Sequence, residues 1–355
     1  MGLFRAQRQY ERVIWIHAGP HKTASTYLIK GLRNNRRGLA AQGVHLARDS
    51  EAESKLLIDQ DWQAFDQRVR QLPQGTQQYL ISREVLHFRV VSPKYFQPLL
   101  KIAHQHGFKL GLIFLIRDQA DWINSMYCHG IRRFYPRKSF WNYCKKTMQK
   151  DVHLGMQYCQ KFNEISGTPE IKKCFIPLSR HASTPDPLMA LTEALHWTKP
   201  KGGWQSVPSD QSNLQPGKKA IWLARSCRQI LEDLNLSPDI LHHKGLVIRD
   251  IALNKQWHLD RYYGFSPKQY KATRDFYALS NDRFAKEYWQ CNWQSLFPDR
   301  QLNNREVYRG PATDAEQMVM QEILMTAMQR MGLPEQHEKA VQQAFASRCK
   351  RQRGL

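Results

Sequence analysis

A lysine and three hydroxyl residues closely follow a short apolar segment near the start of the chain. This segment, Val13–His17, is rich in β-branched and aromatic side chains and leads into the turn Ala18-Gly19-Pro20. The residues that come next are His21, Lys22, Thr23, Ala24, Ser25 and Thr26. The free N–H groups and dipole of a helix N-terminus, joined by a lysine and hydroxyl groups, form a cradle for phosphate oxygens. We therefore predict an anion-binding turn between a strand and a helix.

This turn departs from the phosphate loop of ATPases. That loop, GxxxxGK[ST], has a glycine directly before its lysine, whereas His21 precedes Lys22 here. The sequence also offers no clear acidic partner that would hold a Mg²⁺ ion beside the turn. The alternative interpretation is a capped helix start that carries an incidental lysine. The strand before the turn and the helix after it favour anion binding.

The segment GPHKTASTYL (19–28) resembles the 5′-phosphosulfate loop of the sulfotransferases that use 3′-phosphoadenosine-5′-phosphosulfate (PAPS). The usual form in that family is a lysine followed by Ser or Thr, then Gly, then two hydroxyl residues. Ala24 stands here where glycine is commoner, and alanine is small enough for a phosphate to approach closely. The resemblance implies that residues 21–26 bind the phosphosulfate. It also implies that Lys22 neutralises charge on the bridging oxygen and that no metal ion is needed.

A second segment, IRDQADWINSMY (116–127), resembles the 3′-phosphate-binding segment of the same family. Arg117 ends a predicted strand, and Ser125 lies eight positions later, two turns into the predicted helix. The resemblance implies that these two side chains hold the 3′-phosphate of PAPS, and an arginine fork suits phosphate well. The alternative is that Arg117 pairs with Asp118 or Asp121 at the start of the helix. Weaker resemblances at 32–46 and 279–284 extend the similarity, with gaps, from about residue 13 to about residue 290.

Sulfuryl transfer also needs a base beside the acceptor hydroxyl. Glu84 follows a predicted strand directly, at the same edge of the sheet as Lys22, and carboxylate bases at this place are known in the glycan sulfotransferases that this sequence resembles. His87 lies three residues later and is the rival base, because the small-molecule members use a histidine. The alternative for Glu84 is a first-turn acid that interacts with a helix dipole, and for His87 an ordinary histidine.

Three more apolar segments predict the strands that position these residues, at 79–82, 110–116 and 174–178. They alternate with helical segments such as 23–33 and 118–133. This alternation predicts an α/β fold, a three-layer sandwich in which helices flank a central, mainly parallel sheet. The resemblance implies the P-loop NTPase-like fold of the sulfotransferases.

We predict a lead-in at residues 1–12, a sulfotransferase domain at 13–304, and a helical C-terminal extension with a basic tail at 305–355. In the extension, apolar residues recur at helical spacing, which predicts packing or a contact in an oligomer: Met320, Leu324, Met328 and Met331. The segment 198–217 is rich in Pro, Gly, Ser, Asn and Gln, which predicts a long loop.

The chain of 355 residues carries 53 Lys and Arg against 31 Asp and Glu, a net charge of +22 that favours anionic partners. Basic and aromatic residues interleave after the second motif, which predicts a glycan surface, a nucleic-acid track or a solvated helix face: Arg132, Arg133, Phe134, Tyr135, Arg137, Lys138, Phe140, Trp141, Tyr143, Lys145 and Lys146. Since the two motifs indicate a nucleotide enzyme, nucleic acid is the less favoured partner.

Several function classes are disfavoured. No apolar run approaches the roughly 20 residues of a membrane span, and the first twelve residues lack the apolar centre of a secretory signal. The seven scattered cysteines form no CxxC pair, so we expect reduced thiols and no zinc site. These features together favour a cytoplasmic protein.

The leading hypothesis is a PAPS-dependent sulfotransferase that moves the sulfuryl group to a hydroxyl acceptor, a carbohydrate or glycan, by metal-independent in-line transfer. Two alternatives stay open. One is another P-loop nucleotide enzyme, such as a kinase, and the other is a non-catalytic basic protein that binds polyanions.

Overall fold

The computed structural model describes residues 11–20, 22–47, 50–131, 139–150, 156–179, 186–207, 215, 217–235, 246–302 and 308–353. The chain divides into two compact units that interleave along the sequence. The first unit comprises Met1–Asp118, Gly155–Ser212 and Tyr277–Asp299. The second comprises Gln119–Leu154, Asn213–Phe276 and Arg300–Leu355. The domain limits expected at residues 12 and 304 remain predictions.

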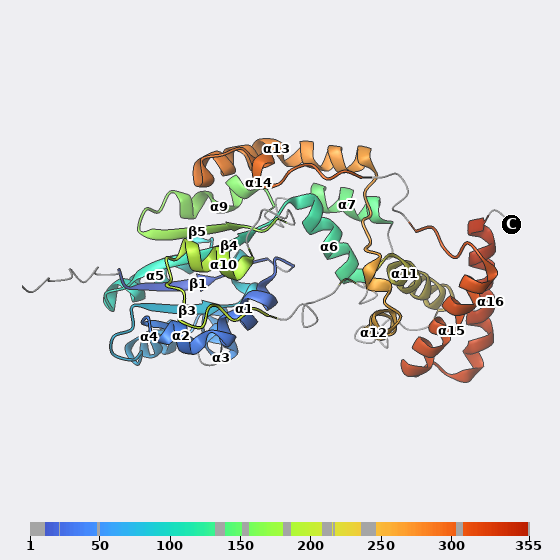
Figure 1. The fold of residues 1–355 in the computed structure, drawn as a ribbon, viewed down its shortest axis with the longest axis horizontal. Helices are drawn as coiled ribbons and strands as arrows, with labels where there is room; N and C mark the ends of the chain where they lie inside the picture. The colour runs from blue at the N-terminus through green and yellow to red at the C-terminus, as the bar shows by residue number, and fades with distance from the viewer. Residues whose placement is uncertain are drawn as a thin grey trace, which may run out of the picture. The chain divides into compact units, whose positions relative to one another are not determined.

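The first unit is built on a five-stranded sheet in which every neighbouring pair of strands is parallel (Figure 1). The strand order is β2-β3-β1-β4-β5. The strands are β1 Val13–His17, β2 Val44–Leu46, β3 Gln78–Ser82, β4 Lys109–Ile116 and β5 Ile171–Pro177. The predicted α/β fold with a central parallel sheet flanked by helices is therefore confirmed, and the four strands expected from apolar runs are all present.

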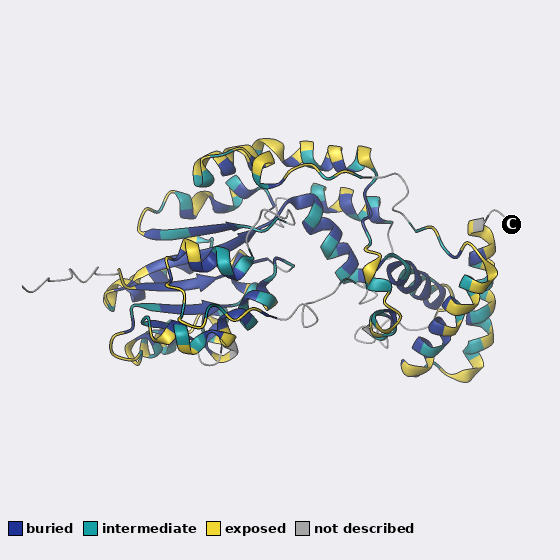
Figure 2. Ribbon diagram, viewed as in Figure 1, coloured by how far each residue is buried: buried dark blue, intermediate teal, exposed yellow. Residues whose placement is uncertain are grey.

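Helices cover both faces of this sheet, which gives three layers. On one face, α1 (Ser25–Asn34), α2 (Arg36–Ala40) and α10 (Pro187–Ala194) pack on a cluster that includes Trp15, Leu115 and Ile176. The other face carries an aromatic cluster of Phe114, Phe162, Phe175 and Phe284, with α9 (Tyr158–Ser166) and the part of α13 (Pro267–Trp289) that belongs to the first unit. Because side chains alternate along a strand, Phe175 and Ile176 face opposite layers. Figure 2 shows the strands buried between these layers.

Further helices connect the strands of the first unit. The segments α3 (Ser50–Asp59) and α4 (Trp62–Arg70) lie between β2 and β3, and α3 contacts β3. A short 3₁₀ helix, η1 (Glu84–Phe88), follows β3, and α5 (Pro93–Gln105) then leads to β4. The short helix α14 (Trp293–Leu296) lies near the end of the unit's last segment.

The order of the strands identifies one place in the sheet where a ligand is expected. The chain leaves β1 for β2, on the far side of β3, but it leaves β4 for β5 in the opposite direction along the sheet. In open parallel sheets, ligands bind outside the C-terminal ends of the strands at such a reversal. The reversal here lies between β1 and β4, where the first motif follows β1 and Arg117 follows β4.

The second unit is helical in the residues that the structure describes. It contains α6 (Gln119–Ile131), α7 (Phe140–Gln149), α11 (Lys218–Asp233), α12 (Leu246–Asn254), η4 (Trp257–Leu259), α15 (Asp314–Arg330), η5 (Glu335–His337) and α16 (Glu338–Arg353). The helical C-terminal region was expected, and its residues Met320, Leu324, Met328 and Met331 are buried, so their predicted packing role is confirmed. Across the described ranges, no helix is both long and apolar enough to cross a membrane.

The expected aromatic surface around α7 is wrong in part. Phe140 is buried, and its ring lies edge-on to Tyr127 and Phe265. The ring of Tyr143 packs on Tyr127 with centroids 5.4 Å apart, and burial raises the pKa of its hydroxyl. Phe140 therefore belongs to the core of the second unit and is not available to stack on sugars, whereas Tyr143 is half-buried. Arg132, Arg133, Phe134, Tyr135, Arg137 and Lys138 lie outside the described residues.

Candidate functional site

The turn after β1 adopts a conformation that few non-glycine residues take. Lys22 has φ 69° and Ala24 has φ 59°, both in the left-handed region. A residue with a Cβ atom pays roughly 1–2 kcal/mol for this conformation. Helix α1 begins at Ser25, two residues later than predicted, with Ala24 at its N-cap and no side chain capping it. The N–H groups of the first turn thus lack the hydroxyl or carboxylate cap that helix starts usually have.

Three polar side-chain atoms gather around the Cα atom of Gly19. A Cβ atom added there would lie 2.8 Å from Thr23 Oγ1, 3.1 Å from Ser25 Oγ and 3.3 Å from His17 Nε2. Thr23 donates to the carbonyl of Pro20 at 2.6 Å. Ser25 Oγ and His17 Nε2 are buried and have no hydrogen-bond partner among the described residues. We call Gly19, His17, Thr23 and Ser25 the Gly19 cradle.

His17 ends β1 and is completely buried. Its Nδ1 lies 2.6 Å from the hydroxyl of Ser82, which ends the neighbouring strand β3. Burial lowers the pKa of His17 to about 4, and the nearby Glu84 carboxylate opposes this shift. The imidazole is therefore neutral near pH 7, with one nitrogen held by Ser82 and the other facing the cradle.

Arg117 links the end of β4 to the turn. Its side chain is buried, and its Nη1 donates a hydrogen bond of 2.8 Å to the backbone carbonyl of Lys22. The carbonyl of Arg117 in turn accepts from the hydroxyl of Tyr158 at 2.7 Å. The next residue, Asp118, accepts from the indole N–H of Trp293 at 3.2 Å. Parts of the chain that are far apart in sequence thus fix this guanidinium beside the Lys22 turn.

A hydrogen bond from the first turn of α1 anchors this helix to the start of α10. The hydroxyl of Tyr27 donates to Asp186 at 2.5 Å, and Asp186 also caps the N-terminus of α10. Burial, followed by the hydrogen bond to Asp186, raises the pKa of Tyr27 to about 12. The phenol therefore stays protonated and holds α1 on α10.

The two candidate bases lie in η1, directly after β3, and their environments differ. Glu84 is half-buried, and its negative charge raises the pKa of His17 against the larger effect of burial. His87 is buried, its Nδ1 lies 2.9 Å from the backbone carbonyl of Glu84, and its ring lies against that of Phe88. A base must reach an incoming hydroxyl. The geometry therefore favours Glu84 over His87.

The remaining predicted residues fall in different places. Lys22 is half-buried, and Thr26 is exposed on the first turn of α1. His21 lies outside the described residues. Ser125 lies on α6, in the second unit. The first unit by itself therefore brings together Lys22, Thr23, Ser25 and Arg117.

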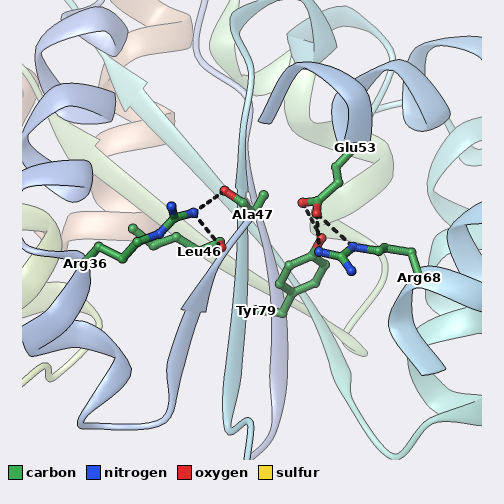
Figure 3. A network of polar contacts seen from close by, with 6 residues as sticks. All are labelled: Arg36, Leu46, Ala47, Glu53, Arg68 and Tyr79. Carbon is green, nitrogen blue, oxygen red and sulfur yellow. Dashed lines mark hydrogen bonds and ion pairs between the residues drawn. The ribbon is translucent and has the colours of Figure 1, made fainter. Parts of the chain in front are cut away.

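Another buried polar cluster in the first unit has a different character (Figure 3). Glu53 on α3 accepts two hydrogen bonds from the Arg68 guanidinium, at 2.8 and 2.6 Å, and one from the hydroxyl of Tyr79 at 2.6 Å. Nearby, Arg36 donates to the carbonyls of Leu46 and Ala47 at 3.1 and 2.7 Å, so this arginine secures the end of β2. We call Glu53, Arg68 and Tyr79 the Glu53 network, which binds α3 and α4 to β3.

The residues His17 and Ser82 were not predicted from the sequence. Both are polar residues that end a buried strand at the edge where parallel sheets bind ligands, and that pattern could have identified them. Comparisons with protein-family models, with curated proteins and with solved structures found no match to this chain.

Proposed function

We propose that this protein is a PAPS-dependent sulfotransferase of the P-loop sulfotransferase-like type. One observation carries the proposal. The uncapped start of α1 lies beside a lysine and two buried polar atoms that have no partner in the described part of the chain, at the reversal point of a parallel sheet. Buried polar atoms without partners cost free energy, and an anion that accepts from several donors would offset that cost.

Each residue of the turn has a defined task under this proposal. The N–H groups at the start of α1 and the hydroxyl of Ser25 bind oxygens of the 5′-phosphosulfate. The ammonium of Lys22 balances the negative charge that develops on the bridging oxygen. The left-handed backbone at Lys22 and Ala24 curves the turn so that successive N–H groups converge, as in other anion-binding nests.

Within the first unit, the 3′-phosphate is assigned to Arg117. The buried guanidinium of Arg117 already reaches the turn through its bond to the Lys22 carbonyl. An anion bound at the turn and one bound at Arg117 would therefore share one rigid wall of the site. This wall suits a nucleotide that carries two separate phosphate groups.

The acceptor is proposed to be a carbohydrate or glycan. The side chains of Val85 and Phe88, close in sequence to Glu84, are 40% and 47% exposed. Lys161 lies over the Phe88 ring, 5.4 Å from its centroid. A partly exposed aromatic ring beside a cation suits a sugar with an acidic substituent, in keeping with the net charge of +22.

The proposal is tested by ligand binding and by transfer of label. Calorimetric titration should show that adenosine 3′,5′-bisphosphate binds at least ten times more tightly than adenosine 5′-phosphate, because of the charged contacts to the second phosphate, which we take as about 1.5–3 kcal/mol. Donor labelled with ³⁵S should transfer label to a panel of glycans. Equal affinity for the two nucleotides would refute the 3′-phosphate site. Magnesium-dependent phosphate transfer from ATP would favour the kinase alternative.

Changing the two candidate bases identifies the proton acceptor. We expect Glu84→Gln to reduce label transfer about 10²–10⁴-fold, the usual contribution of a general base, while bisphosphate affinity stays within twofold. His87→Ala should retain transfer in proportion to the protein that remains folded. If His87→Ala removes transfer and Glu84→Gln does not, His87 is the base.

A further inference from the structure

His17 has an imidazole nitrogen that nothing in the described structure satisfies. The side chain is completely buried, and Nε2 lacks a hydrogen-bond partner among the described residues. Its other nitrogen, Nδ1, lies 2.6 Å from Ser82 Oγ. Leaving a buried polar atom without a partner costs about 1–3 kcal/mol. Such an atom beside a binding site indicates a ligand atom that completes it.

The position of Nε2 identifies the ligand that it faces. Both Nε2 and Ser25 Oγ lie within about 3.3 Å of the place that a Gly19 Cβ would take, so both border the same glycine surface. Ser25 is the first residue of α1, and its hydroxyl also lacks a partner among the described residues. Two unsatisfied buried atoms therefore lie together at an uncapped helix start. One oxygen of an anion bound there can accept from both of them.

Ser82 decides which proton the imidazole presents. A neutral imidazole has one N–H and one lone pair, and the bond made by one nitrogen fixes the role of the other. When the Ser82 hydroxyl donates to Nδ1, the proton must reside on Nε2. An anion only accepts hydrogen bonds, so its binding selects this tautomer.

We propose that His17 is a neutral donor to the bound donor nucleotide, its Nε2–H directed at a 5′-phosphosulfate oxygen and its tautomer set by Ser82. This inference rests on the proposed function and deepens it. The bond adds a donor from the end of β1 to those at the start of α1. His17 binds the leaving nucleotide and takes no proton from the acceptor.

The tautomer can be observed directly by ¹⁵N NMR of the full chain labelled at histidine. On titration with adenosine 3′,5′-bisphosphate at pH 7, the His17 signals should show a proton on Nε2 and a shift of that proton to lower field. The signals are assigned by their loss in His17→Gln. A His17 ring that carries its proton on Nδ1 in the complex would overturn the proposal.

Variants measure what the bond contributes to binding. The side-chain amide of His17→Gln can supply an N–H near the position of Nε2, so this variant should bind the bisphosphate within about fivefold of wild type. His17→Leu has similar bulk without a donor and should bind about 10- to 100-fold more weakly, as expected for one hydrogen bond to a charged group. Ser82→Ala releases the tautomer and should weaken binding several-fold.

Tyr79→Phe is the matched control for these variants. It removes a buried hydrogen bond on β3, three residues before Ser82, and should lower stability while leaving bisphosphate affinity unchanged. Affinities are compared only among variants that unfold cooperatively. If His17→Leu does not fold, the NMR titration of the wild-type chain and the affinity of Ser82→Ala decide.

Titration with inorganic pyrophosphate separates this inference from the proposed function. If the bisphosphate binds but leaves the His17 signals and the His17→Leu affinity unchanged, the His17 role is refuted and the nucleotide site stands. If no nucleotide binds but pyrophosphate shifts His17 Nε2–H, the anion-donor role stands and the sulfotransferase proposal fails. If neither ligand affects His17, both are refuted.

Discussion

The Gly19 cradle and the Glu53 network are two buried polar clusters on the same sheet, and they differ in how their hydrogen bonds are completed. In the network, both carboxylate oxygens of Glu53 accept from Arg68 or Tyr79. In the cradle, His17 Nε2 and Ser25 Oγ have no partner within the described parts of the chain. The polar atoms of the Glu53 network bond to one another and need no ligand. Their hydrogen bonds hold α3 and α4 against β3. The cradle has donors to offer.

The backbone shows the same contrast. Near the network, Asp61 caps α4 with a hydrogen bond of 3.0 Å to Ala64 N. At the cradle, α1 begins without a side-chain cap and after two left-handed residues. Strain and unsatisfied donors at one place are typical of binding sites. Changes in the cradle should therefore affect binding, and changes in the network should affect stability.

Among the variants that test this comparison, we expect Lys22→Ala to have the largest effect. Label transfer should fall about 10²–10³-fold, the usual loss when one preorganised charge-stabilising group is removed from a reaction centre. The midpoint of thermal unfolding should change little, because Lys22 is half-buried and lies in a turn. Lys55→Ala, which removes an exposed lysine on α3, is the matched control. Transfer at the wild-type rate would exclude Lys22 from catalysis.

His17→Gln should next reveal the cost of burying an uncharged imidazole. The pKa of His17 is about 4 in the folded chain against 6.5 for the free side chain. Between these pH values the unfolded chain binds more protons, so the free energy of unfolding falls as pH decreases from 6.5 towards 4. This shift of the pKa corresponds to about 3 kcal/mol of unfolding free energy that wild type loses on acidification. His17→Gln has no imidazole and should not show this loss.

This prediction is checked by urea unfolding at intervals from pH 4 to pH 7. The quantity compared is the slope of the unfolding free energy with pH in the variant and in wild type. Equal slopes would show that His17 binds a proton as readily in the folded chain as in the unfolded chain.

Glu53→Gln tests the other half of the comparison. The amide leaves Arg68 and Tyr79 without their charged acceptor, and we expect the free energy of unfolding to decrease by about 2 kcal/mol. Arg68 is partly exposed, so solvent screens part of the loss. Affinity for adenosine 3′,5′-bisphosphate should stay within twofold of wild type. A large loss of affinity in a stable variant would contradict the division of roles.

Ala24→Gly should have the smallest effect and sharpens the comparison. Glycine adopts φ 59° without the steric cost of a Cβ atom, but it also gives the unfolded chain more freedom. Relief of the backbone strain exceeds the entropic cost, which leaves a net stabilisation of about 0.5 kcal/mol. Bisphosphate affinity should be equal to that of wild type or slightly higher. A loss of stability would show that Ala24 is unstrained.

The parts of the fold that could be predicted are those whose local sequence pattern determines the element. The run Leu110–Ile116 lies within β4 because an unbroken apolar segment can only be buried on both faces. The helix from Asp314 was recognisable because Met320, Leu324 and Met328 recur on one side. The order of the strands was not predictable, because right-handed crossovers allow several orders.

Site features that depend on distant partners escaped prediction. Nothing local to Lys22 and Ala24 indicates left-handed backbone, and nothing near Arg117 shows that its guanidinium reaches the Lys22 carbonyl. The alternation of basic and aromatic residues around Phe140 suggested a surface. Its ring is instead buried against Tyr127 on the preceding helix α6 and against Phe265, which lies far from it in sequence.

The central place of β1 has a consequence for how this molecule can change. Ladders on both sides hold β1, and the two edge strands, β2 and β5, are each separated from it by one intervening strand. Amides of β1 should exchange with deuterium only through the rarest openings of the first unit. Insertions or altered loops beside the edge strands β2 and β5 should therefore leave β1 undisturbed. These edges are the places where new specificity can be engineered.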